Sequence, residues 1–235
     1  MSDFQARRRF LSRAAALSAT ALLPTAQAFT LQETKPAEKS GKAEEVSPTE
    51  DLMREHGVLN RVLLIYEELG NRLRNQREFD PKTLTDAAGI IRRFIEQYHE
   101  KLEEDYVFPR FEKAGKLTDL VQTLKSQHAA GRRVTADIQQ LSTAASLKTP
   151  ANRTRLEDAL HAFIRMYRPH EAREDTVLFP ALHDLISQHE FDALGEDFEK
   201  KEHELFGEEG FEKMVAEVTG LEKSLGLYDL SQFTP

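Results

Sequence analysis

From residue 47 onward, apolar residues recur every three or four positions, which is the spacing of one face of an α-helix. In the first such segment the inward positions step alternately by four and three residues. They are Leu52, His56, Leu59, Leu63, Tyr66, Gly70 and Leu73. The segment opens with Ser47-Pro48-Thr49-Glu50, a capping box with proline at the first helical position. We therefore expect a helix that begins directly after Ser47.

Three further segments repeat this spacing. The second follows Asp80-Pro81 and the fourth follows Thr149-Pro150. Their inward positions are, in chain order, Leu84, Ala88, Ile91, Ile95, His99, Leu102 or Glu103, and Tyr106; Leu117, Val121, Leu124, His128, Gly131, Val134, Ile138 and Leu141; and Leu156, Leu160, Phe163, Tyr167, His170, Glu174 and Val177. Short connections favour antiparallel neighbours, and no strand pattern competes. The sequence predicts an all-α fold, an up-down-up-down four-helix bundle at residues 47–186.

A fifth helix is expected near the C-terminus. Ser187 and Glu190 form a second capping box, and the helix should reach Phe206. A helical pattern then continues through residues 211–225. Residues 187–235 are therefore predicted to be a C-terminal helical extension of the bundle.

The first 46 residues have a different character. Arg7-Arg8-Arg9-Phe10-Leu11 precedes a weakly apolar run at residues 14–23, and Ala26-Gln27-Ala28 has the small-x-small pattern of a cleavage site. Residues 1–28 resemble a twin-arginine signal peptide, which implies the twin-arginine export machinery, cleavage after Ala28 and a periplasmic or otherwise exported protein. A cytosolic amphipathic helix is the alternative. Residues 29–46 contain almost no large apolar residue and are predicted to be a flexible linker. No later segment has the continuous apolar run of a membrane span, so none is expected in the mature protein.

Composition limits the chemistry. The 235 residues carry a formal net charge of −8, which provides no broad basic surface for a phosphate backbone. Nucleic acid is therefore not expected as a partner. The chain contains no cysteine, which excludes disulfides, thiolate catalysis and cysteine-based metal sites. Any bound metal must use histidine, aspartate or glutamate ligands.

The chain contains an internal repeat. The stretch HEKLEEDYVFP at residues 99–109 aligns without a gap with HEAREDTVLFP at residues 170–180, an offset of 71 positions. A nearly equal offset of 72 positions separates His56 from His128. The four helices are therefore predicted to be two copies of a helix pair, related by a pseudo-twofold axis.

The repeat places chemically active groups on the inward faces. Each of the four helices carries one histidine there, and the second and fourth add a glutamate four residues later, on the same face. The candidate metal ligands are His56, His99, Glu103, His128, His170 and Glu174. Burying six such groups without compensation would be costly. Two divalent cations remove that cost, and the glutamates can bridge them. In contrast, His161, His183 and His189 are predicted to lie at the surface, Tyr66, Tyr106 and Tyr167 to pack in the core, and His203 is left open.

These residues resemble the hemerythrin-like family, the HHE cation-binding domain. The likeness covers about residues 47–185 and rests on His56, His99-Glu100-x-x-Glu103, His128 and His170-Glu171-x-x-Glu174. It implies a non-heme di-iron centre of two iron ions, bridged by both glutamates and an oxo, hydroxo or water ligand. The first two histidines would serve one iron and the last two the other. Zinc or manganese remains an alternative, because His/Glu ligation suits several metals.

One departure from the family bears on function. Oxygen-carrying hemerythrins have a further histidine one turn after the third-helix ligand, where this chain has Arg132. Fewer protein ligands leave open coordination positions, one of which Glu100 or Glu171 could fill. Open positions favour reaction with O₂, peroxide or nitric oxide over reversible oxygen carriage. We therefore expect an exported di-iron protein that reacts with such small molecules. The alternatives are an oxygen or iron binding, storage or sensing module without turnover, and a helical protein with structural metal.

Overall fold

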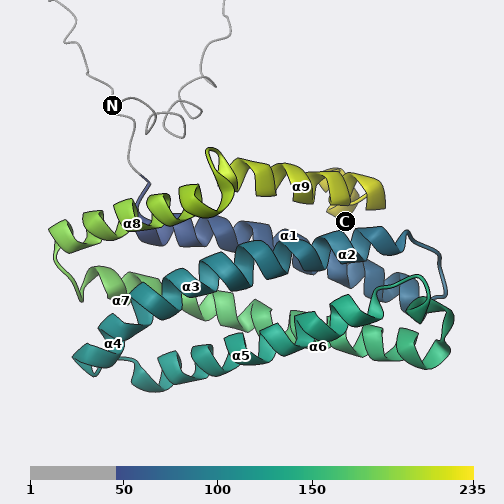
Figure 1. Ribbon diagram of the computed structural model, residues 1–235, viewed down its shortest axis with the longest axis horizontal. Coiled ribbons are helices and arrows are strands. Elements are labelled where there is room, and N and C mark those ends of the chain that lie inside the picture. Colours follow the sequence, from purple (N-terminus) through teal and green to yellow (C-terminus); the bar gives the residue numbers. More distant parts are fainter. Residues whose placement is uncertain (1–45) are drawn as a thin grey trace, which may run out of the picture. The chain divides into compact units, whose positions relative to one another are not determined.

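The computed structural model describes residues 46–235, and every regular element within this range is helical (Figure 1). The expectation of an all-α fold is thus confirmed for this part of the chain. The expected signal peptide, at residues 1–28, and nearly all of the expected linker, at residues 29–46, lie outside the described residues. Within residues 46–235, no helix is long and apolar enough to cross a membrane.

Four long helical segments carry the four predicted rows of inward positions, which are called stripes below. The first is α1 (Pro48–Arg74) and the third is α5 (Thr118–Leu141), which is followed by the short η5 (Ser146–Lys148). The second runs without a break through α2 (Pro81–Ile90), η3 (Ile91–His99), α3 (Glu100–Leu102), η4 (Glu103–Val107) and α4 (Phe108–Ala114). The fourth runs through α6 (Pro150–Arg173), η6 (Glu174–Leu178) and α7 (Phe179–His183). The C-terminal part comprises α8 (Gln188–Phe206), α9 (Gly210–Leu225) and η7 (Leu230–Phe233).

The predicted helix starts follow from local capping chemistry. The hydroxyl oxygens of Ser47 and Ser187 accept hydrogen bonds from the backbone N–H groups three residues later, at 3.2 and 3.3 Å. Asp80 caps α2 with its carboxylate, which accepts a hydrogen bond from the backbone N–H of Lys82, two residues later, at 2.9 Å. Thr149 precedes α6 but its side chain makes no capping hydrogen bond. Proline at the first position of α6 fixes the start there.

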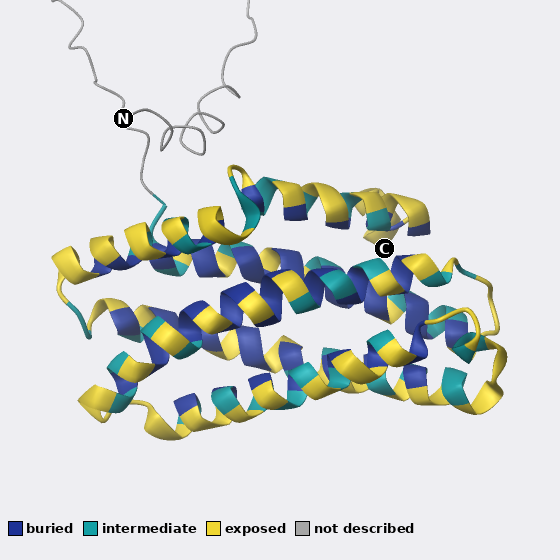
Figure 2. Ribbon diagram, viewed as in Figure 1, coloured by how far each residue is buried: buried dark blue, intermediate teal, exposed yellow. Residues whose placement is uncertain are grey.

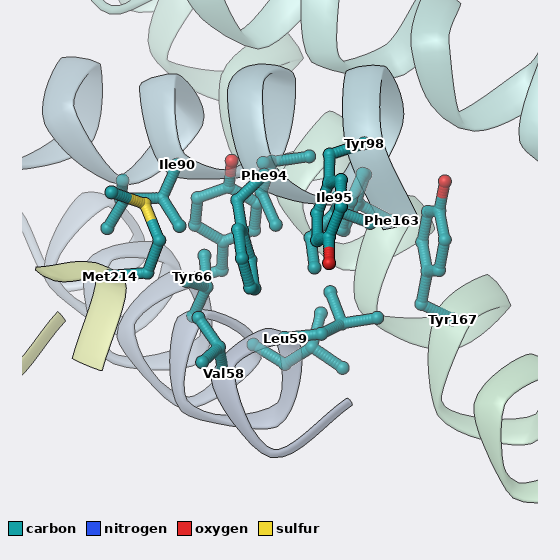
Figure 3. Packing of buried hydrophobic residues seen from close by; sticks show 14 of the residues in the cluster. Val58, Leu59, Tyr66, Ile90, Phe94, Ile95, Tyr98, Phe163, Tyr167 and Met214 are labelled. Atoms are coloured by element: carbon teal, nitrogen blue, oxygen red, sulfur yellow. The ribbon is translucent and has the colours of Figure 1, made fainter. Parts of the chain in front are cut away.

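The helices lie side by side and share one apolar core. Helix α1 packs against α6 and α9, α5 packs against α6, and η3 lies against α1 and α5. Helices α8 and α9 lie along the side formed by α1 and the second segment (Figure 1). Figure 2 shows buried faces turned inward and exposed faces turned outward on every long helix. Figure 3 shows part of this core, to which α1 contributes Leu59, η3 contributes Phe94, α6 contributes Phe163 and α9 contributes Met214.

Two π-helical turns correct the predicted register. The stripes placed Tyr106 and Val177 inside, but both are only half-buried, and the next residues, Val107 and Leu178, are buried instead. A π-helical turn, η4 or η6, covers each position and adds a residue to the helical repeat. Each turn comes just before a proline, Pro109 or Pro180. Proline has no backbone N–H to donate a hydrogen bond to the carbonyl four residues earlier, and the wider turn accommodates its ring.

The third predicted stripe also needs a correction at its start. Leu117 is 37% exposed and has a left-handed backbone with φ of 51°. It therefore precedes the helix instead of belonging to its inward face, and α5 begins at Thr118.

Candidate metal centre

Six side chains from four helical segments meet in the interior. His56 comes from α1, His99 from the end of η3, His128 from α5 and His170 from α6. The two glutamates, Glu103 and Glu174, open the π-helical turns η4 and η6. None of the six side chains is more than 4% exposed. The structure thus brings together all six residues that the sequence singled out, within one buried region.

The six residues divide into two groups of three that can each hold a cation. One group is His56, His99 and Glu103, and the other is His128, His170 and Glu174. The Nε2 atoms of His56 and His99 are 3.1 Å apart, and those of His128 and His170 are 3.2 Å apart. This histidine pairing is the same as the one implied by the family resemblance.

Each glutamate lies between the two histidine pairs. Glu103 Oε2 is 3.7 Å from His99 Nε2 and 3.4 Å from His128 Nε2. Glu174 Oε2 is 3.2 Å from His170 Nε2 and 3.4 Å from His56 Nε2. A carboxylate near one histidine of each pair is in the position of a bridging ligand, so both glutamates connect the two halves of the site.

The donor set fits two cations. All four carboxylate oxygens of Glu103 and Glu174 are buried without a hydrogen-bond partner among the described residues. Such groups are costly unless something satisfies them, and a cation would. Two nitrogens that each lie about 2.0–2.1 Å from one ion are roughly 3 Å apart, as the Nε2 atoms are here. The protein therefore presents ligand atoms with the chemistry and the spacing that a paired metal site needs.

The same crowding shifts the protonation of these groups. Burial, and next the neighbouring Glu174, raises the pKa of Glu103 well above its usual range. Burial also lowers the pKa of His99 well below its usual range and that of His170 to about 4. At His56 burial acts in the same direction, but the hydrogen bond to Asp175 and the negative charges of Glu174 and Asp175 outweigh it and raise the pKa to about 10. Without a cation, the site therefore retains protons that metal binding would displace.

Each histidine is oriented through its other ring nitrogen. His56 Nδ1 lies 2.7 Å from Asp175 Oδ1, and His99 Nδ1 lies 2.8 Å from Glu55 Oε2. His128 Nδ1 lies 3.2 Å from Glu104 Oε1, and His170 Nδ1 lies 2.9 Å from Gln127 Oε1. These bonds leave the Nε2 atoms turned toward one another and strengthen the rings as ligands.

These four orienting residues were not predicted from the sequence, although the repeat contains a signal for them. Glu55 and Gln127 directly precede the first histidine of each copy, and Glu104 and Asp175 directly follow Glu103 and Glu174. Each residue contacts a histidine on a different helix. The partner of each could therefore be assigned only after the helix packing was known.

Glu100, expected as a possible extra ligand, is engaged elsewhere. Its Oε1 accepts a hydrogen bond from Tyr167 at 2.6 Å, and its Oε2 lies 2.7 Å from Arg132 Nη2. The same arginine nitrogen is 2.6 Å from Glu104 Oε1. The arginine that replaces the further histidine of oxygen carriers thus pairs with carboxylates beside the site. Glu171 accepts a hydrogen bond from Asn60 Nδ2 at 3.0 Å, and burial raises its pKa to about 7.

The other histidines and tyrosines that the sequence singled out lie at the surface, in the core or, in one case, between the two. His161, His183 and His189 are exposed, as predicted, and His203, which the sequence left open, is exposed too. Tyr66 and Tyr167 are buried in the core, whereas Tyr106 is half-buried. Tyr167 does more than fill space, because its ring lies against that of His170 with centroids 5.3 Å apart.

Comparison with known proteins identifies relatives. The sequence profile of the hemerythrin HHE cation binding domain matches residues 47–182. Proteins of Mycobacterium tuberculosis and Mycobacterium bovis, both named as uncharacterized, are 53% identical to the chain over 190 residues. The match covers 81% of this chain and 74% of each relative. No solved structure matches the chain significantly.

Proposed function

We propose that this chain, which belongs to the hemerythrin HHE cation-binding domain family, is a di-iron protein. In this proposal its metal centre reacts with O₂, peroxide or nitric oxide. The observation that carries this proposal is the pair of buried ligand groups joined by two glutamates. In this proposal, His56 and His99 hold one iron and His128 and His170 the other. Glu103 and Glu174, each of which lies near one histidine of both pairs, would supply the carboxylate ligands. The bound iron supplies redox change and Lewis acidity.

The protein's own residues shield the site and keep its ligands in place. The ring of Phe179 stacks on His56 with centroids 5.6 Å apart, and Phe108 stacks on His128 at 5.5 Å. These phenylalanines occupy equivalent positions in the two repeats and limit the access of water. The hydrogen bonds at Nδ1 hold each imidazole in one orientation, so the ligand atoms need little rearrangement when a cation binds.

The number of protein ligands favours reaction over carriage. The proposed set contains four histidines and two glutamates, and Arg132 pairs with Glu100 and Glu104 at the place of a further histidine. A guanidinium cannot serve as a ligand, because it has only donors. Positions left to small molecules favour direct reaction at the metals.

The proposal includes the arrangement and the destination of the protein. We interpret the four ligand-bearing segments as the expected up-down-up-down four-helix bundle, with α8 and α9 as its extension. We also propose that residues 1–28 direct twin-arginine export to the periplasm. That route suits a protein whose metals are inserted before it crosses the membrane.

Elemental analysis is the first test. Residues 29–235 would be purified without added metal, and iron, zinc and manganese measured per chain. About two irons per chain are expected, as in other paired-carboxylate bundles. Zinc in a folded protein, with no gain of oxidant chemistry after iron is added, would contradict the proposal and favour a structural metal.

A second measurement distinguishes reaction from carriage. The reduced iron-loaded protein would be taken through repeated cycles of aeration and deoxygenation while its absorption spectrum is recorded. A reactive centre consumes the oxidant and remains oxidised until a reductant is added. A carrier would recover its reduced spectrum on deoxygenation alone, which would contradict the proposed reaction.

A further inference from the structure

A groove outside the metal centre lies between α1 and α6. Its volume is about 460 Å³, within the range of small-molecule sites in proteins. Tyr66 and Gly70 of α1 and Leu160 and Ile164 of α6 contribute its apolar lining, and Asn71 and His161 contribute polar groups. Charged side chains of both helices surround this lining. The groove thus combines an apolar surface with a polar edge, as ligand sites commonly do.

Gly70 leaves open space beside this groove. It is a buried residue within the 27-residue helix α1, where glycine is a poor helix former. A Cβ atom at this position would meet no heavy atom within 4 Å. Gly131 provides the contrast, because the hydroxyl of Tyr167 fills the space that its side chain would take. Packing therefore explains the glycine at 131 but not the one at 70, and an external ligand could use the space beside Gly70.

The charges at the groove favour an anion. Two ion pairs link the helices, Arg74 with Glu157 and Arg168 with Glu67. Within the part of the chain that the structure describes, Arg165 forms no ion pair, although it lines the same groove. A guanidinium with five donors and no carboxylate partner is suited to a carboxylate, sulfonate or phosphate group. The paired carboxylates are already neutralised, so the unpaired positive charge decides the preference.

Aromatic side chains separate the groove from the metal site. The ring of Tyr66 lies 5.4 Å from that of Phe163, which lies 4.3 Å from that of Tyr167. Only Tyr167 reaches the histidines, through its contact with His170. A molecule in the groove would therefore lie behind two buried rings and would not contact the candidate metal ligands.

We propose that this groove is a second binding site, which takes a small organic anion with an apolar or aromatic body. The apolar part would occupy the space beside Gly70, against the half-buried Ile164, and the anionic group would pair with Arg165. This site does not depend on metal in the interior, so it can be tested whether or not the proposed di-iron function is correct.

The test uses an aromatic sulfonate, 8-anilinonaphthalene-1-sulfonate, and its uncharged analogue N-phenyl-1-naphthylamine as fluorescent probes. Titrations would be made on residues 29–235 and on the variants Gly70→Leu, Arg165→Gln and Gly220→Leu. Gly220→Leu is the matched control, because this exposed glycine of α9 also has open space around it. Circular dichroism would verify that each variant is folded, and a second titration at tenfold higher protein concentration would detect self-association.

The expected result is saturable binding of about one sulfonate probe per chain, weakened about tenfold or more by Gly70→Leu and several-fold by Arg165→Gln. Gly220→Leu should bind like the unaltered protein, and the uncharged analogue should bind more weakly. Equal binding by folded Gly70→Leu would overturn the proposal, since it would place the probe elsewhere. So would a loss of binding at high protein concentration, which would assign the groove to a second copy of the chain.

Discussion

The hydroxyl oxygen of Tyr167 lies 2.0 Å from the point that a Cβ atom on Gly131 would occupy. No side chain fits there unless the tyrosine moves. Tyr167 is also held from other directions, by its hydrogen bond to Glu100 and by its ring contact with His170. A glycine on α5 therefore determines where a phenol on α6 contacts a candidate metal ligand.

Gly131→Ala should displace Tyr167 and break its hydrogen bond to Glu100. Overpacking of a core position typically costs about 1–3 kcal/mol of unfolding free energy, more than alanine gains in helix propensity. Denaturant unfolding of the metal-free protein measures this loss. Gly220→Ala, on an exposed face of α9, should instead stabilise the protein by up to about 1 kcal/mol. A Gly131→Ala protein as stable as the unaltered chain would contradict this account of the contact.

Glu103→Gln should have opposite effects on the metal-free and metal-loaded protein. Burial raises the pKa of Glu103, so its ionised form opposes folding when no cation is bound. Metal-free stability should therefore fall as the pH rises above the ordinary carboxyl pKa, and less steeply in the variant. At pH 7, where burial favours the protonated form of Glu103, replacing this carboxyl group with a neutral amide should stabilise the metal-free variant by about 1–3 kcal/mol. The same variant should lose metal, which elemental analysis and thermal unfolding with added iron would show.

Alanine variants test whether the six buried histidines and glutamates are the metal ligands. Glu103→Ala and Glu174→Ala should both lose metal and the stability that metal confers, because each carboxylate contacts both histidine pairs. His161→Ala should change neither property, since this side chain is exposed on α6. Equal metal content in all three variants would show that the six residues are not the ligands.

Much of the site could be predicted because it depends on helical periodicity. The four-residue spacing from His99 to Glu103, and from His170 to Glu174, places each pair on one helix face wherever the helix packs. The repeat then indicated that two such pairs face each other. Capping boxes at Ser47 and Ser187 located two helix starts for the same reason, because their hydrogen bonds are local.

The remainder depended on how the helices pack. The bond from His99 to Glu55 joins residues 44 positions apart, and no local pattern indicates that these two side chains meet. The π-helical turns moved Val107 and Leu178 inward, a shift that a constant period of 3.6 cannot describe. Glu100 was considered as a ligand because the sequence does not show that Arg132 and Tyr167 engage it.

Arg132→Met should destabilise the metal-free protein by leaving Glu100 without its cation. Glu100 is 1% exposed, and a buried carboxylate that loses a charged partner costs about 1–3 kcal/mol or more. Burial already raises the pKa of Glu100, so the loss should diminish at low pH, where this carboxyl is protonated in both proteins. Adding Glu100→Gln to Arg132→Met should recover part of the stability. Equal losses in the single and double variants, measured by denaturant unfolding, would rule out this explanation.

Asp175→Asn should reduce the number of protons that metal binding releases. Burial acts to lower the pKa of His56, but Asp175 and Glu174 raise it to about 10. At pH 7 the metal-free ring is therefore an imidazolium, with a proton on Nε2 as well as on Nδ1. That proton must leave before Nε2 can bind a cation, so affinity should increase with pH. The variant lacks one of the two carboxylates, which lowers this pKa. Metal-free stability, by the same linkage, should decline less steeply between pH 6.5 and 10 in the variant.

Calorimetric titration with Zn²⁺, a redox-inert probe, in buffers of different ionisation enthalpy would count the released protons. At pH 7 Asp175→Asn should release up to about one proton fewer than the unaltered protein, and should bind about 10–100-fold more weakly. Gln127→Ala is the control, because it removes the neutral partner of His170 Nδ1 and leaves the charge near His56 unchanged. It should weaken binding without changing the proton count. Equal proton release by the unaltered protein and Asp175→Asn would mean that Asp175 does not hold the proton on His56.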